Sequence, residues 1–305
     1  MSYLLPHNPR SLGDLVGLAF RLLRAHWRLV IQRFLTPSIF MSVSIAGLEW
    51  CFVHWVQAQS MDVGWFAIHI VFAFALVIIL IASQWEIALR SAALIRFVLI
   101  EDYNFDEGYE YARKKQWSIL SVYAVSFLVP MAVCFFWFFL FGLTAFFGQS
   151  GFVGKLMCIP LGFLEGVFFV ATFSFSMLYT ALCFIVVSVK DPSIGGALLE
   201  GYRLSAAKLS RGLSFVCLLA VAIFLMMMVF YIPVAILGIW DAYVQGIMNE
   251  TEFPIWLRVL DATVGCVTNI ISVGAALFGI SAYYRDLKMR SYGEDILEAI
   301  ELKSK

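Results

Sequence analysis

Four polar residues lie within long apolar stretches of this sequence, where they could do chemistry that lipid-facing side chains cannot. They are Glu49, Glu165, Asp261 and Asn269. Ionisable groups inside membrane segments are costly and often mark ion, proton or substrate pathways. All except Asn269 are expected towards the outer leaflet. Two interpretations follow: a polar cavity that opens outwards, or side chains that reach the interface or form interhelical hydrogen bonds.

No catalytic motif accompanies these residues. The sequence has no His-Glu-x-x-His and no Gly-x-Ser-x-Gly, and its four histidines (His7, His26, His54 and His69) lack metal-ligand spacing. The stretch Gly148–Lys155 resembles a phosphate loop, but its spacing is wrong and no Ser or Thr follows the lysine. The six cysteines form no Cys-x-x-Cys pair. We therefore predict a protein that is not an enzyme and has no cofactor or metal.

The composition requires a membrane around the helices that would position the polar residues. Of 305 residues, 62% are hydrophobic and only 14% are charged, and the mean hydropathy is +0.88. Soluble domains carry about a quarter charged residues. A soluble core of this length could not bury so much apolar surface. Soluble, disordered and fibrous classes are excluded.

Six apolar runs are long enough to cross a bilayer as helices, which takes about 20 residues each. They lie around residues 34–56, 65–83, 118–147, 156–188, 212–239 and 255–284. Of the 21 basic residues, all except Lys155 and Arg258 fall on one side of these runs. Since cytoplasmic loops are enriched in Lys and Arg, both termini are predicted to be cytoplasmic. No cleavable signal peptide is expected, and the first span would drive insertion.

A threefold pattern predicts how the runs are organised. Ser11, Asn104 and Ser193 each stand where a helix cap is expected before an apolar-periodic segment. We predict one membrane domain, 1–305, built from three parallel repeats at about 8–100, 101–190 and 191–290, with a cytoplasmic tail at 285–305. Each repeat would contain an amphipathic elbow helix and a helical hairpin.

The first elbow is the clearest amphipathic segment. Leu15, Leu18, Leu22 and Leu29 share one side, and three arginines share another. Such a helix suits the headgroup boundary of a membrane. The predicted contacts with lipid headgroups or a partner are Arg21, Arg24, Arg28, Arg203, Lys208 and Arg211.

Several local features refine the predicted helices. Positions 65–100 could form one helix of about 54 Å, with Glu86 and Arg90 paired one turn apart. Gly162-x-x-x-Gly166 predicts close helix packing around Glu165. Three prolines lie inside apolar runs and are expected to kink them: Pro130, Pro160 and Pro233.

Three segments carry a resemblance to a known family. They are Pro9-Arg-Ser-Leu-Gly-Asp-Leu followed by Ala19-Phe-Arg-Leu-Leu-Arg, then Asp191-Pro-Ser-Ile with Ala197-Leu-Leu-Glu-Gly-Tyr-Arg-Leu, and the run from Tyr283 to Asp295. The chain resembles the bacterial six-helix membrane-domain family named for glycerophosphoryl diester phosphodiesterase membrane domains. The resemblance implies a helical membrane domain of the bacterial inner membrane. The phosphodiesterase activity of fused relatives belongs to a separate barrel, for which this chain has no room.

The sequence supports two hypotheses of different classes. The first is a non-enzymatic membrane protein that organises a partner complex or binds anionic lipid through its cytoplasmic amphipathic helices. The alternative is a transporter, lipid flippase or channel-like protein with an outward-facing polar cavity. The expected partners are membrane lipids, with a protein partner or a second copy of the chain possible. No nucleic acid is expected.

Overall fold

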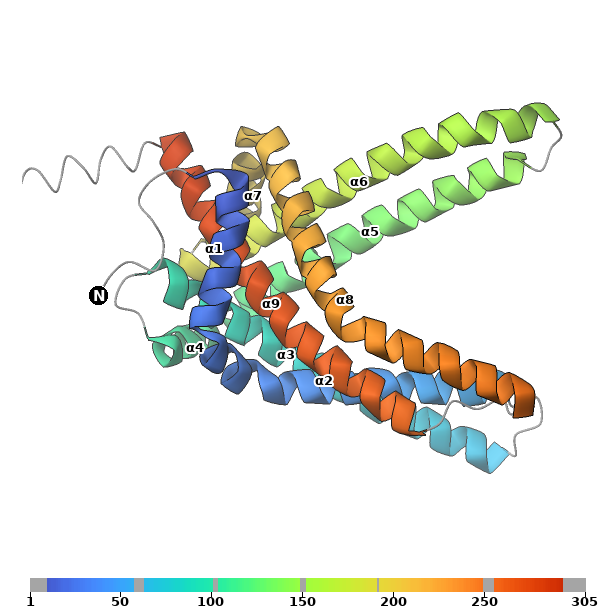
Figure 1. Ribbon diagram of the computed structural model, residues 1–305. Coiled ribbons are helices and arrows are strands. Elements are labelled where there is room, and N and C mark those ends of the chain that lie inside the picture. Colours follow the sequence, from blue (N-terminus) through green and yellow to red (C-terminus); the bar gives the residue numbers. More distant parts are fainter. Residues whose placement is uncertain are drawn as a thin grey trace, which may run out of the picture. The chain divides into compact units, whose positions relative to one another are not determined.

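The structure, a computed structural model, describes residues 10–57, 63–100, 104–148, 152–190, 192–248 and 255–292. These residues are almost entirely helical and contain no strand (Figure 1). Three short helices are α1 (Leu12–Ala25), α4 (Phe105–Lys114) and α7 (Ile194–Ala207). Six long helices are α2 (Trp27–Gln57), α3 (Val63–Leu99), α5 (Gln116–Gly148), α6 (Phe152–Val189), α8 (Leu209–Met248) and α9 (Ile255–Tyr292).

The six long helices match the six predicted apolar runs. Each is long and apolar enough to cross a membrane, so an all-α fold with six membrane-length helices is confirmed. The continuous α3 confirms the single long helix expected over 65–100. Within it, Arg90 Nε lies 3.2 Å from Glu86 Oε2, which confirms the predicted pair. The three predicted prolines and Pro37 all lie inside long helices.

Two of the predicted caps are visible as hydrogen bonds. Ser11 Oγ accepts the backbone N–H of Asp14 at 3.2 Å, and Ser193 Oγ accepts that of Gly196 at 3.2 Å. At the third, the carboxylate of Glu107 accepts the backbone N–H of Asn104 at 3.5 Å. These bonds satisfy donors that every helix N-terminus leaves open. Asp102, Asp191 and residues 1–9 lie outside the described residues.

Burial follows the same register in all three short helices. The fourth and eighth residues after each cap are buried, namely Leu15 and Ala19, Gly108 and Ala112, and Ala197 and Gly201. A spacing of four residues places both members of a pair on one helix face. Each short helix therefore uses the same face, counted from its cap, to contact the protein.

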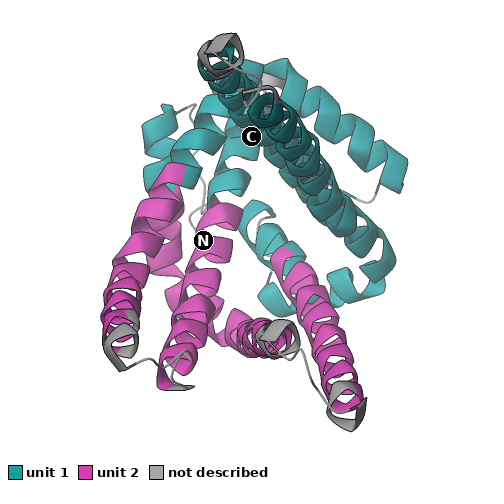
Figure 2. Ribbon diagram, turned by 90° about the vertical axis from the view of Figure 1, so that its right-hand side faces the viewer, with its two compact units in different colours: residues 1–18, 92–220, 279–305 teal, residues 19–91, 221–278 magenta. Residues whose placement is uncertain are grey.

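The described residues divide into two compact units, coloured in Figure 2. Unit 1 comprises the described parts of Met1–Leu18, Ala92–Ala220 and Gly279–Lys305. Unit 2 comprises Ala19–Ser91 and Val221–Phe278. Four helices, α1, α3, α8 and α9, contribute residues to both units.

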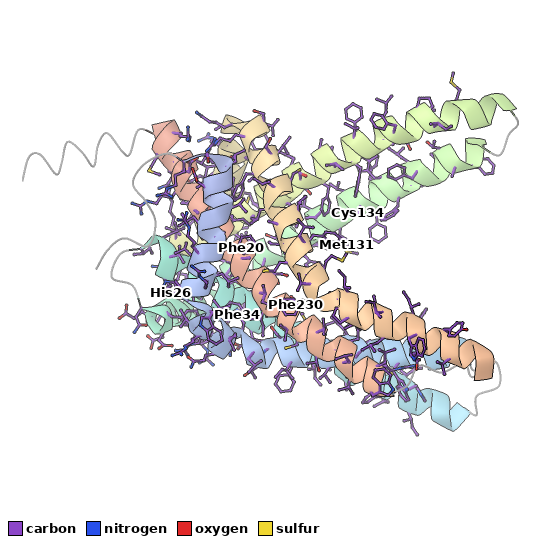
Figure 3. All side chains as sticks on the ribbon, in the orientation of Figure 1. Phe20, His26, Phe34, Met131, Cys134 and Phe230 are labelled. Atoms are coloured by element: carbon purple, nitrogen blue, oxygen red, sulfur yellow. The ribbon has the colours of Figure 1, made fainter. Side chains whose placement is uncertain are left out.

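In unit 1, short helices pack against the ends of long ones. A Cβ at Gly108 of α4 would lie 3.0 Å from the backbone oxygen of Ala93 in α3. A Cβ at Gly201 of α7 would lie 2.9 Å from the backbone nitrogen of Cys183 in α6. These approaches are possible only because glycine has no side chain. The α5–α6 hairpin of the same unit projects large apolar side chains outwards (Figure 3), including Phe138 at 70% exposure.

In unit 2, α9 is the helix against which others pack. A Cβ at Gly274 would lie 2.7 Å from Leu23 Cδ1 and 3.1 Å from Val30 Cγ1. His26, between α1 and α2, has its ring centroid 6.2 Å from that of Phe278. Burial lowers the pKa of His26 below its ordinary value of 6.5. Gly274 is thus a position where α9 leaves no room for a side chain.

Candidate functional site

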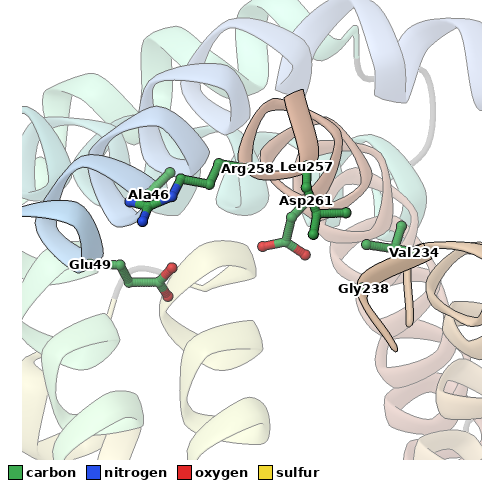
Figure 4. A pocket seen from close by; sticks show the side chains of 7 residues that line it. All are labelled: Ala46, Glu49, Val234, Gly238, Leu257, Arg258 and Asp261. Carbon is green, nitrogen blue, oxygen red and sulfur yellow. The ribbon is translucent and has the colours of Figure 1, made fainter. Parts of the chain in front are cut away.

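Unit 2 contains a cavity of about 300 Å³ between α2, α8 and α9. Its volume is at the lower end of the range of small-molecule sites. Figure 4 shows the lining side chains. They are Ala46 and Glu49 from α2, Val234 and Gly238 from α8, and Leu257, Arg258 and Asp261 from α9.

The cavity brings together two of the four predicted polar residues and adds a cation. Arg258 and Asp261 are three residues apart, so α9 places them on one face. Glu49 reaches the same cavity from α2. Both carboxylates are exposed and Arg258 is half-buried. The other described lining residues have apolar side chains or none, so among them the charged groups supply the polar chemistry of this cavity.

Asn269 lies elsewhere on α9. Its Nδ2 donates a hydrogen bond of 3.0 Å to Oγ of the buried Ser38 in α2. Eight residues separate it from Asp261, which is about 12 Å along a helix. Asn269 therefore joins α9 to α2 within unit 2 and is not a lining residue.

Glu165 belongs to unit 1. Thr144 Oγ1 of α5 donates a hydrogen bond of 2.5 Å to Glu165 Oε1 of α6. Among the described residues, the buried Oε2 has no hydrogen-bond partner. The glycines on either side do not form the predicted close helix packing, because a Cβ at Gly162 or Gly166 would have no atom within 4 Å. The contact between α5 and α6 here is polar.

The basic residues predicted to contact headgroups differ in their surroundings. Arg21 and Arg24 of α1 and Arg28 of α2 are all exposed. The guanidinium carbon of Arg28 lies 5.9 Å from the ring centroid of Trp27, and Trp27 is 50% exposed. In unit 1, Arg203 and Lys208 of α7 and its C-terminal end are also exposed.

Arg211 differs from the other predicted headgroup contacts. Its Nη2 lies 3.0 Å from Oδ2 of Asp286 and 2.5 Å from the carbonyl oxygen of Arg10. Asp286 is 1% exposed and also accepts from Arg290 Nε and from the backbone N–H of Arg10, both at 2.9 Å. This network fastens residue 10 to the end of α9, so the structure gives Arg211 an internal role.

Asp286 and Arg96 were not singled out as site residues by the sequence. Arg96 of α3 donates to the carbonyl oxygens of Ser188 at 2.8 Å and Val189 at 3.3 Å. Its guanidinium carbon lies 3.7 Å from the ring centroid of Tyr111 in α4. The sequence indicates their role only weakly, since each is a charged residue next to apolar residues near the end of a helix. Both join elements of unit 1.

Some sequence predictions fall on parts that the structure does not describe. The side chains of His54 and Lys155, and residues His7 and 293–305, lie outside the described residues. Within the described part of the chain, no group of three or more His, Cys, Asp or Glu residues is placed to hold a metal.

Comparisons with protein-family models, curated proteins and solved structures give no match. The predicted family resemblance therefore stays a prediction, and the functional proposal below depends on the residues of this chain.

Proposed function

We propose that this chain is a non-enzymatic integral membrane protein that binds anionic lipid through its amphipathic short helices α1 and α7 and the basic residues beside them. The short helices would lie at the cytoplasmic surface, with both termini on that side. The expected membrane is the bacterial inner membrane. Partner proteins would assemble on the lipid surface that this binding organises.

One observation carries the proposal: α1 separates a buried apolar face from an exposed basic one. Leu15, Ala19 and Leu22 are between 0% and 6% exposed. Arg21 and Arg24 are exposed on the same helix. Amphipathic helices with this division lie in the headgroup region, where each basic side chain contributes about 1 kcal/mol of attraction to anionic lipid.

The residues that follow α1 favour the same location. Arg28 and Trp27 open α2, and an exposed tryptophan beside an arginine is typical of the membrane interface. In unit 1, α7 has a comparable division, with Leu204 buried and Arg203 and Lys208 exposed. The shared burial register of the short helices, described above, supports the proposal of three related repeats.

The proposal is tested by lipid titration of the purified protein. The variant replaces Arg21, Arg24 and Arg28 together by Gln, and native mass spectrometry measures retention of phosphatidylglycerol against phosphatidylcholine. We expect the preference for phosphatidylglycerol to fall about fivefold for each charge removed. It should also weaken as salt is raised.

A matched control removes three exposed positive charges from the end of α4 and its C-cap. Arg113, Lys114 and Lys115 are exposed, but the same segment carries the acidic residues Asp106, Glu107 and Glu110. Replacing the three basic residues by Gln should leave the lipid preference nearly unchanged. Equal losses in the two triple variants would contradict a specific role for the α1 face.

The cavity of Glu49 and Asp261 favours a second candidate function, a transporter or lipid flippase. Opposed charges within one cavity between three long helices are the observation that supports it. Reconstituted protein should then move fluorescent phospholipids between leaflets, and the double variant Glu49→Gln, Asp261→Asn should lose this activity. Glu165→Gln should retain it, since Glu165 does not line the cavity. Equal exchange in protein-free vesicles would refute the candidate.

A further inference from the structure

We propose that the cavity between α2, α8 and α9 binds the headgroup of a zwitterionic phospholipid that carries a primary amine. The ammonium group would lie between the carboxylates of Glu49 and Asp261, and the phosphate would bind Arg258. This site does not include the basic faces of the short helices. The proposal of a headgroup site therefore does not depend on whether those faces bind anionic lipid.

The position of the cavity along α2 is the first argument. Trp27 and Glu49 are separated by 22 residues, which corresponds to about 33 Å of helix. The hydrocarbon core of a bilayer is about 30 Å thick. When Trp27 lies at one membrane interface, Glu49 therefore lies at the opposite one.

Each of the three lining helices carries a tryptophan close in sequence to a lining residue, and these tryptophans also indicate that the cavity lies at the membrane interface. Trp50 directly follows Glu49, Trp240 lies two residues after Gly238, and Trp256 directly precedes Leu257. They are 37%, 65% and 52% exposed, respectively. Exposed tryptophans concentrate at the headgroup level of membranes. The cavity thus opens where lipid headgroups are found.

The charged side chains that line the cavity have no partner among the described residues. Among the described residues, no hydrogen bond or ion pair engages Glu49, Arg258 or Asp261, although all three line one cavity. Charges at a membrane boundary are stabilised when a complementary group meets them. Two carboxylates and one guanidinium have a net charge of −1, which favours a ligand containing both a cation and an anion.

The chemistry of these groups narrows the ligand further. A primary ammonium donates up to three hydrogen bonds, enough for two carboxylates, whereas a quaternary ammonium donates none. The planar guanidinium of Arg258 matches the geometry of a phosphate. The three helices that line the cavity also carry exposed apolar side chains, including Val43, Ile236 and Val259, which offer a surface to acyl chains. A lipid therefore fits better than a free solute.

The test measures binding of phosphatidylethanolamine, phosphatidylcholine and water-soluble phosphoethanolamine to the purified full-length protein by native mass spectrometry. We expect phosphatidylethanolamine to bind at least about tenfold more tightly than the other two. The double variant Glu49→Gln, Asp261→Asn should lose this preference, as should Arg258→Gln. Glu110→Gln, which removes an exposed carboxylate from α4, should keep it.

Substitutions at Gly238 test the cavity without changing any charge. A Cβ at Gly238 would meet Leu257 Cδ2 at 3.9 Å, an ordinary contact, so Gly238→Ala should bind normally. Gly238→Leu should fill the space and abolish binding. Equal affinity for phosphatidylethanolamine and phosphatidylcholine, or an unchanged preference in the charge variants, would overturn the proposal. Phosphoethanolamine binding as tightly as the lipid would overturn the assignment to a lipid. If Gly238→Leu does not fold, the charge variants decide.

Discussion

Replacing Gly201 by alanine should destabilise the protein, although alanine is the better helix former. Gly201 lies inside α7, which packs against α6 within unit 1. An added Cβ would lie 2.9 Å from the backbone nitrogen and 3.0 Å from the Cα of Cys183, and would also contact its Sγ. The sulfur can turn away, but the α6 backbone cannot move without disturbing its helix.

The expected magnitude is a difference between two opposed effects. Alanine gains up to about 1 kcal/mol over glycine inside a helix. Overpacking typically costs about 1–3 kcal/mol, and a contact with backbone atoms belongs at the upper end of that range. The net loss should be roughly 1–2 kcal/mol, or a factor of about 5–30 in the ratio of folded to unfolded protein.

Gly195 on the same helix is the matched control. A Cβ at Gly195 would have no atom within 4 Å, so Gly195→Ala should be neutral or stabilise by up to about 0.5 kcal/mol. Thermal unfolding of both variants in the same detergent measures the sign of each effect. Adding Cys183→Ala to Gly201→Ala should recover only part of the loss, because the backbone contacts remain. Equal behaviour of the two glycines would refute the close approach of α7 to α6.

Three further predictions concern polar groups. Asp286→Ala should cost about 2–4 kcal/mol, because two arginines lose a buried partner; unfolding should show this loss, and Glu110→Ala, at an exposed site, should show almost none. Burial lowers the pKa of His26, so the unfolded chain binds a proton at this residue more readily than the folded chain does. The free energy of unfolding of the wild type should therefore be at its full value above about pH 6.5 and decrease below it. A His26→Phe variant with the same pH dependence would contradict this. Thr144→Val should cost about 1–3 kcal/mol by removing the donor to Glu165, and a double-mutant cycle with Glu165→Gln that gives no coupling would refute the bond.

Structural features that depend on residues close together in the chain could be predicted from the sequence. The six long helices follow from apolar runs of membrane length. The caps at Ser11 and Ser193 follow from short polar residues before apolar-periodic segments. The ion pair of Glu86 and Arg90 follows from one helical turn. Each of these depends on residues that are close together in the chain.

The sequence could not predict which polar residues lie together, because hydrophobic periodicity does not show which helices are neighbours. Glu49, Glu165 and Asp261 were expected at a similar membrane depth, but depth does not say which helices are neighbours. Glu165 pairs with Thr144 in its own hairpin, whereas Glu49 and Asp261 line one cavity from α2 and α9. Arg258 contributes to that cavity because it lies one turn from Asp261.

Long-range bonds at helix ends could not be predicted for the same reason. Asp286 binds the N–H of Arg10, 276 residues away, and Arg96 binds the carbonyl of Ser188, 92 residues away. A charged residue near the end of an apolar run is equally compatible with lipid headgroups and with a partner in the protein. Tertiary packing decides between these roles, as it does for Arg211.

The central claim is that the α1 face binds anionic lipid, and mild extraction from native membranes tests it most directly. Mass spectrometry should identify the lipids and proteins that co-purify with wild-type protein and with the variant in which Arg21, Arg24 and Arg28 are replaced by Gln. We predict that anionic phospholipid co-purifies with the wild type and is depleted from the variant. The same lipids on both proteins, or a stoichiometric protein partner without anionic lipid, would contradict the claim.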